Sequence, residues 1–281
     1  MIKRLSGAAV RAILVALLIV TPALFVPSEV SDASQVVVLV ALLAAVMVFV
    51  EYNSAYASFI EFRCAPPYNR VRFFGVVAAV LVLSLACRGK VEPTNLTSLM
   101  ASVSTIIGNA ADFPYSPVRL VTLVLPQDVD PELVRSVRSA AGTAYFISLI
   151  MMLVFVSLVR FLGWPTRNGA FNVWLNLPMF DPTAGGDVVQ RLQRDARINL
   201  SLGFILPFLA PAVAKSAATF VNPMMLSNPH TLIWVVVLWA FVPANLIMRG
   251  IALGRIAEMI EQKRKRAHLS DADRIEVMQT A

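Results

Sequence analysis

The stretch GTAYFISLIMMLVFVSLVRF, residues 142–161, decides what kind of fold this chain can form. Arg160 is its only charged residue, and that arginine lies next to the carboxyl end of the stretch. A bilayer hydrocarbon core about 30 Å thick needs roughly 20 consecutive apolar residues in a spanning helix. Residues 142–161 are therefore predicted to form a transmembrane helix.

Five more apolar blocks lie on either side of this stretch. The chain is 58% hydrophobic and 15% charged, whereas an ordinary soluble domain carries about 25% charged residues. Six such blocks are too many for one soluble core, so the sequence predicts an all-α integral membrane protein. We expect a single polytopic domain over residues 1–266 and a polar cytoplasmic tail over 267–281. The expected transmembrane helices lie at about residues 8–26, 34–50, 73–86, 142–161, 200–221 and 231–248.

The connections between these blocks differ in charge. Most of the 24 lysines and arginines fall before or within the first block, in the connections 51–72 and 162–199, and after residue 248. Segments rich in Lys and Arg stay in the cytoplasm, so both termini are predicted to be cytoplasmic. Short loops and a preference for arginine favour a bacterial cytoplasmic (inner) membrane. The isoelectric point near 9.8 reflects this orientation, and no nucleic acid is expected as a partner.

The first block allows a second interpretation. Lys3 and Arg4 precede an apolar run followed by small residues at Ser31 and Ala33, which is also the pattern of a cleaved signal peptide. Cleavage would leave five transmembrane helices and an outer amino terminus. The apolar run continues to Val26 and is longer than a usual signal core, so the uncleaved form is expected.

The longest outer connection, residues 88–141, is predicted to contain ordered elements. Thr94 can cap a helix that is expected to pack on the helix bundle as a lid. The alternative is that its apolar stripe lies at the outer membrane interface. Residues 118–125 form a short apolar run, either a strand or a buried segment. Asp130, Pro131 and Glu132 are a typical helix start, and that helix should continue into the 142–161 block. The apolar stripe consists of Leu96, Leu99, Met100, Val103, Ile106, Ile107 and Ala110.

On the cytoplasmic side, the second helix is expected to run past the membrane. Helical spacing places Tyr52, Tyr56 and Phe59 on one face, and Pro66-Pro67 would end the helix. In the next cytoplasmic connection, Asp187 can cap a helix that leads into the fifth block.

The segment 171–179 alternates between larger apolar residues and other residues, which is the period of a two-faced strand. An exposed strand has unpaired backbone groups. It can pair with another segment of this chain, pair with a partner or second copy, or lie extended in the lipid headgroups. The headgroup arrangement is preferred, and no second alternating run is evident. The candidate partner-contact residues are Phe171, Val173, Trp174, Leu175, Leu177 and Met179.

The fifth block contains residues spaced by four that would form one stripe ending in a cation. Two prolines in this stripe free backbone carbonyls, and transporters build substrate sites from such broken helices. The simpler interpretation is that the spanning helix tolerates both prolines and that the lysine side chain reaches the outer surface. In the sixth helix, Gly250 and Gly254 permit close helix contact. The candidate pathway stripe is Asn199, Gly203, Pro207, Pro211 and Lys215.

The sequence contains no phosphate-binding glycine loop, metal-ligand spacing or nucleophile motif. We therefore expect no catalytic residue, cofactor or metal. The preferred hypothesis is a non-catalytic accessory, assembly or interaction component of a membrane complex. Its expected partners are the lipid bilayer and either another membrane protein or further copies of this chain. A small permease or channel using the proline-containing fifth helix is the alternative, and a membrane-embedded enzyme is the third.

Overall fold

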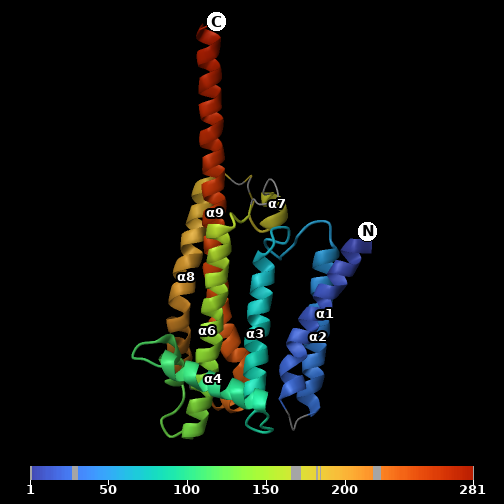
Figure 1. Cartoon of the computed structure of the whole chain (residues 1–281), viewed down its shortest axis with the longest axis vertical. Coiled ribbons are helices and arrows are strands. Elements are labelled where there is room, and N and C mark those ends of the chain that lie inside the picture. The colour runs from blue at the N-terminus through green and yellow to red at the C-terminus, as the bar shows by residue number, and fades with distance from the viewer. Residues whose placement is uncertain are drawn as a thin grey trace.

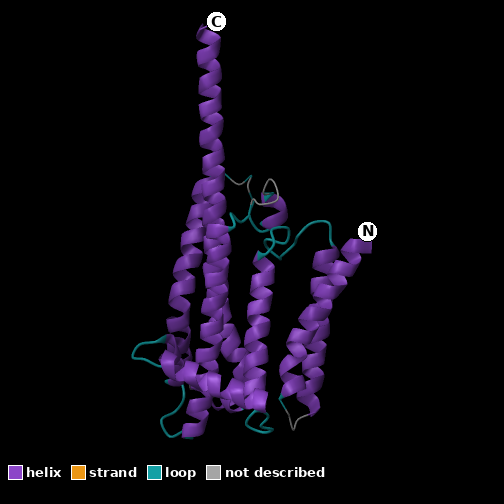
Figure 2. Ribbon diagram, in the orientation of Figure 1, coloured by secondary structure: helices purple, strands orange, loops and turns teal. Residues whose placement is uncertain are grey.

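A computed structural model describes residues 2–26, 31–165, 172–181, 183, 185–217 and 223–280 of the chain. All regular elements within these residues are helices, and six of them are long and apolar enough to cross a membrane (Figure 2). The all-helical prediction is therefore confirmed for the described residues, and each long helix overlaps one predicted block. These helices are α1 (Ile2–Phe25), α2 (Ser31–Asn53), α3 (Tyr68–Arg88), α6 (Pro131–Phe161), α8 (Val188–Ser216) and α9 (Pro229–Thr280).

The long helices run side by side, and both ends of the chain lie at the same end of the bundle (Figure 1). We call this end the basic end, because it holds Arg11 of α1 and Arg70 and Arg72 at the start of α3. α9 packs against α8, α6 and α3. α1 and α2 form a hairpin at one side of the bundle, and this hairpin meets the other long helices mainly through α3.

At the opposite end, α4 (Asn95–Ala111) lies across the bundle (Figure 1) and contacts α3 and α6. The predicted Thr94 cap is confirmed, since its hydroxyl accepts a hydrogen bond from the Thr97 N–H at 3.3 Å. The face of α4 that meets the bundle is small and polar, with Thr97, Ser104 and Gly108 buried. The predicted apolar stripe points outward instead, and Ile106 is 68% exposed.

Gly108 determines how closely α4 approaches α6. A Cβ added to Gly108 would lie 2.6 Å from the Ser139 Cα and 2.9 Å from the Arg138 carbonyl oxygen. A Cβ added to Gly142 would in turn lie 2.6 Å from the Gly108 Cα. Two glycines therefore allow backbone-to-backbone contact where the two helices cross.

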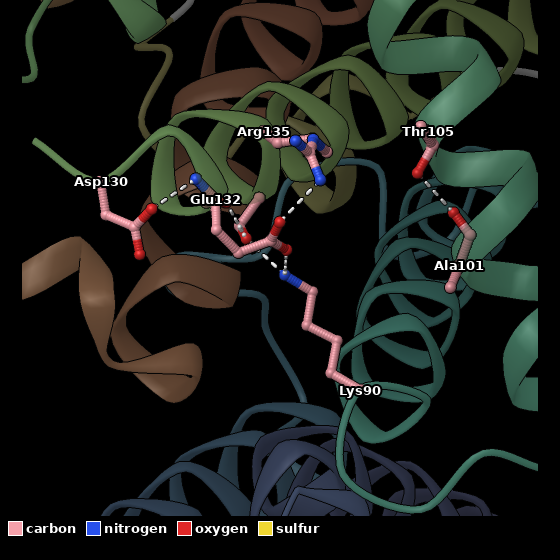
Figure 3. Close-up of polar contacts among 7 residues, drawn as sticks. Lys90, Ala101, Thr105, Asp130, Glu132 and Arg135 are labelled. Atoms are coloured by element: carbon pink, nitrogen blue, oxygen red, sulfur yellow. Dashed lines mark hydrogen bonds and ion pairs between the residues drawn. The ribbon is translucent and has the colours of Figure 1, made fainter.

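α6 begins as predicted, with the Asp130 carboxylate accepting from the Glu132 N–H at 2.9 Å and Pro131 in the first position. The Glu132 carboxylate accepts from the ammonium of Lys90 at 3.1 Å and from Arg135 at 2.8 Å (Figure 3). Lys90 follows α3, so this cluster connects the end of α3 to the start of α6. Figure 3 also shows the Thr105 hydroxyl donating to the Ala101 carbonyl within α4 at 2.9 Å.

The apolar run 118–125 is a buried helical segment and not a strand. α5 (Pro117–Thr122) begins at Ser116, whose hydroxyl accepts from the Arg119 N–H at 3.0 Å. Val118 and Leu125 are buried, and α5 packs against α6 and α8. Proline at the first position and a serine cap favour a helical turn.

The prediction that the second helix continues to Pro66-Pro67 is wrong. α2 ends at Asn53, and the chain then folds back over its own last turn. The Glu51 carboxylate, which is buried, accepts from the N–H groups of Ser58 at 2.8 Å and Ile60 at 3.2 Å. A carboxylate that satisfies several loop amides stabilises a compact loop at the expense of further helix.

α9 continues past Arg266, the last residue of the expected polytopic domain, to Thr280 as one helix. Figure 1 shows it projecting well beyond the start of α8. Near this point the Arg264 guanidinium donates to the Asp187 carboxylate at 2.7 Å. That hydrogen bond holds the pKa of the Asp187 carboxyl below its usual range. The predicted Asp187 cap of α8 is confirmed by its bond from the Val189 N–H.

Candidate functional site

A cavity of about 760 Å³ lies at the basic end, between the α1–α2 hairpin and α3. A volume of this size lies within the range of about 300–1,000 Å³ that is usual for ligand pockets. Its lining residues are Ser6, Gly7, Val10, Arg11, Leu14, Val15, Leu18, Val48, Tyr52, Ile60, Asn69, Arg70, Arg72, Phe73, Phe74, Val76 and Asn245.

Three arginines line this cavity. Arg11 lies over the Tyr52 ring at 4.7 Å and donates to the Gly7 carbonyl at 2.6 Å. Arg72 donates through Nε to the Asn245 Oδ1 at 2.6 Å and through Nη1 to Asn69 at 3.3 Å. All of these partners are neutral, so the positive charges remain available to a bound anion.

The opposite part of the cavity wall is apolar. Leu14, Val15 and Leu18 lie progressively further along α1, while Phe73 and Val76 lie further along α3. Both helices run away from the basic end in this direction (Figure 1). The cavity is therefore amphipathic, with guanidinium groups at the basic end and hydrocarbon further into the bundle.

An ion pair next to the cavity joins α9 to the loop that precedes α3. The Arg249 guanidinium donates to both Glu61 oxygens, from Nε at 2.6 Å and from Nη2 at 2.8 Å. The Glu61 side chain is only 13% exposed. Its backbone carbonyl accepts from the Asn69 amide at 2.8 Å, so the pair also positions one of the residues that hold Arg72.

An aromatic cluster packs against the same loop as the Glu61–Arg249 ion pair. Phe62, Tyr68, Phe155 and Trp164 are all buried, and their ring centroids lie 4.4–6.0 Å apart. The Trp164 indole N–H donates to the Ala65 carbonyl at 3.1 Å. The cluster packs the loop before α3 onto the end of α6, next to Asn69 and Arg70 of the cavity lining.

The chain matches no protein-family model, no curated protein and no solved structure. Its function is therefore argued from the geometry of its own residues. No group of three or more His, Cys, Asp or Glu side chains suited to a metal ion occurs among the described residues.

The segment predicted to be a strand forms a single helical turn, α7 (Val173–Asn176), so the strand prediction is wrong. Phe171 and the Trp174 side chain lie outside the described part. The Asn172 side chain caps this turn by accepting from the Leu175 N–H at 3.3 Å. Asn176 then donates to the Asn172 carbonyl at 2.9 Å. Two asparagines that bond to nearby backbone override an alternating apolar pattern.

The partner of this segment is the loop that follows α2. The Asn176 carbonyl accepts from the Phe62 N–H at 2.7 Å, and its side-chain oxygen accepts from the Cys64 N–H at 3.0 Å. Leu177 is buried in the core, whereas Met179 is 79% exposed. The described residues of the segment therefore satisfy part of their backbone within the chain.

Replacing Asn176 by alanine should loosen this contact. The Cys64 N–H and the Asn172 carbonyl would each lose a partner, at a local cost of about 1–2 kcal/mol. We expect the Cys64 amide to exchange with deuterium roughly 5- to 30-fold faster. Asn53→Ala, at an exposed position, should leave that exchange rate unchanged. Equal rates in both variants would contradict the assigned role of Asn176.

The predicted pathway stripe lies where α8 meets α9. A Cβ added at Gly203 would lie 2.8 Å from the Pro243 carbonyl oxygen of α9. Lys215 donates to the carbonyl of Leu123 at the end of α5. These positions favour helix packing as the role of the stripe, while its use as a pathway stays a prediction. The buried members are Asn199, Gly203, Pro207 and Pro211.

The carbonyl freed by Pro211 has a partner in α9. Pro211 has no N–H to donate to the Pro207 carbonyl, and the Trp239 indole N–H donates to that oxygen at 3.1 Å. Gly250 also lies at this contact, because an added Cβ would be 2.8 Å from the Ala196 carbonyl oxygen. Gly254 is less constrained, with 3.9 Å to its nearest neighbour.

Trp239→Phe should remove the partner of the Pro207 carbonyl and keep most of the ring packing. We expect the free energy of unfolding in detergent to fall by about 1–2 kcal/mol, because a carbonyl inside the bundle is left unsatisfied. Trp234→Phe on the same helix is the matched control, since the structure gives its indole no hydrogen bond within the described residues. A loss of the same size in the control would contradict the bond.

Proposed function

We propose that the chain is a multi-pass protein of a bacterial cytoplasmic membrane with both termini in the cytoplasm. We further propose that it acts, without catalysis, as an accessory or assembly component of a membrane complex. The membrane location is supported by the outer faces of the long helices. Leu39 and Leu42 of α2, for example, are 66% and 61% exposed, and apolar surface of this extent is typical of contact with lipid or protein.

The proposed orientation makes the basic end cytoplasmic, in agreement with the positive-inside rule. A cysteine introduced at Asp128, which is exposed between α5 and α6, should react with an impermeant maleimide in intact cells. The natural Cys64, exposed at the basic end, should react only after the membrane is made permeable. The reverse labelling order would contradict the orientation.

The projecting part of α9 is the observation that supports an interaction role. At 1.5 Å per residue, the 52 residues of this helix extend about 78 Å, far more than a hydrocarbon core of about 30 Å. Described side chains from Gln262 to His268 are exposed. A polar helix without packing is only marginally stable in water, and binding to another protein would stabilise it.

Photo-crosslinking in cells tests this role. A photoreactive amino acid at Gln262 or Lys263, on the projecting part of α9, should give a discrete adduct with one partner. The same amino acid at Arg194, exposed on α8 at the same end, is the matched control and should not give that adduct. Identical products at all three positions, or none at Gln262 and Lys263, would count against the proposal. The permease alternative has less support, because α9 covers the candidate pathway stripe.

A further inference from the structure

We propose that the cavity between the α1–α2 hairpin and α3 binds one anionic phospholipid. Its headgroup would lie among Arg11, Arg70 and Arg72, and an acyl chain would run along the apolar walls. This inference rests on the proposed membrane location, since the lipid would enter from the surrounding bilayer.

Charge is the first argument. The described lining contains three arginines and no aspartate or glutamate. Elsewhere in the described structure many arginines have carboxylate partners, as Arg249 does with Glu61 and Arg264 with Asp187. Arg11, Arg70 and Arg72 form no ion pair with any described residue. A phosphate is the anion that matches guanidinium donors, because it accepts paired N–H bonds.

The arrangement of Arg72 is the second argument. Asn245 of α9 and Asn69 hold this guanidinium through neutral side-chain oxygens, while its carbon lies 5.4 Å from the centre of the Tyr68 ring. The group is therefore oriented before any anion arrives, and it keeps its full charge. Preorganised donors lose less entropy when a ligand binds than mobile ones do.

The apolar part of the cavity matches an acyl chain in chemistry. The side chains of Val15, Leu18 and Val76 offer water no polar partner, and a cavity needs such partners to hold water. An empty space would leave these side chains without packing contacts. In a bilayer the nearest material that can fill the space is lipid hydrocarbon, which is as apolar as leucine.

The cavity is also open along its apolar length. Val10, Leu14 and Phe74 line it and are 56%, 41% and 63% exposed. A soluble anion would need only the arginine end, whereas a lipid needs a side opening through which its chain remains continuous with the bilayer. Because the acyl chain gains little over its place in the bilayer, the arginines supply the selectivity between anionic and neutral lipids.

The test uses the full chain reconstituted in bilayers of phosphatidylcholine and phosphatidylglycerol in equal parts. After mild detergent extraction, mass spectrometry measures the ratio of the two lipids that remain bound. We expect enrichment of phosphatidylglycerol over the starting bilayer. Arg11→Gln/Arg70→Gln should reduce this enrichment roughly 5-fold per arginine, which corresponds to about 1 kcal/mol for each cation near a headgroup.

The control variant is Arg160→Gln/Arg197→Gln, which removes two exposed arginines outside the cavity and should leave the enrichment unchanged. Adding inorganic phosphate should not displace the lipid; displacement would identify a soluble-anion site and overturn the lipid proposal. Insertion without enrichment, or equal loss in the two double variants, would overturn it while the membrane location stands. Failure to insert into either lipid would overturn both proposals.

Discussion

Gly108→Ala is expected to separate α4 from α6 and to destabilise the protein strongly. The added methyl carbon would lie 2.6 Å from the Ser139 Cα and 2.9 Å from the Arg138 carbonyl oxygen. Both neighbours belong to the backbone of α6, so no side chain can rotate to make room. Overpacking of this kind costs about 1–3 kcal/mol or more, and we expect a value at the upper end of that range.

Thermal unfolding of the purified chain in detergent measures this effect. Gly254→Ala is the matched control, because its added carbon would be 3.9 Å from the nearest atom and in ordinary contact. In a helix interior, alanine is favoured over glycine by up to about 1 kcal/mol, so the control should be neutral or slightly stabilising. If Gly108→Ala were also neutral, α4 would not pack on α6 as described.

Glu61→Gln is expected to cause the second large loss. The glutamine keeps the shape of the side chain but leaves the partly buried Arg249 guanidinium without its countercharge. Removing one partner of a fully buried pair costs about 3–5 kcal/mol. Since the Glu61 and Arg249 side chains are 13% and 30% exposed, solvent screening should reduce the loss to about 2 kcal/mol.

Chemical and thermal unfolding again provide the measurement. Glu261→Gln is the control, because its partner Lys265 is 71% exposed at the side chain and such a pair contributes at most about 1 kcal/mol. The double variant Glu61→Gln/Arg249→Met should recover part of the loss, since the unpaired charge is then removed. A double variant less stable than Glu61→Gln would show that the loss does not come from the unpaired arginine.

The helices and their starts were predictable because they depend on neighbours in the sequence. Thr94, Asp130 and Asp187 each cap a helix through an amide two or three residues away. An apolar run of about 20 residues likewise indicates a spanning helix, whatever its tertiary partners are. These features needed only local composition and spacing.

The two incorrect predictions both concern side chains that bond to loop backbone. Glu51 accepts from amides seven and nine residues later, and Asn176 accepts from the Cys64 amide 112 residues earlier in the chain. Neither bond follows from helical or strand periodicity. The lesson from these residues is that polar side chains at the end of an apolar run fold the chain onto itself.

The cavity was not predicted for a similar reason. Arg11, Arg70 and Arg72 appeared in the sequence only as signs of orientation, because the positive-inside rule counts charges without locating them. Their convergence depends on the α1–α2 hairpin lying against α3. The proximity of Arg72 to Asn245 on α9 spans 173 residues of sequence and could not be read from spacing.

The continuity of α9 connects the projecting part of this helix directly to the residues beside the cavity. Asn245, which holds Arg72, and Arg249, which binds Glu61, lie on the same unbroken helix as its projecting end. Between these two residues and the projecting end, Gly250 lies against α8 and Arg264 donates to the Asp187 cap. One continuous helix therefore joins whatever binds the projecting end to the residues that position Arg72, without an intervening loop.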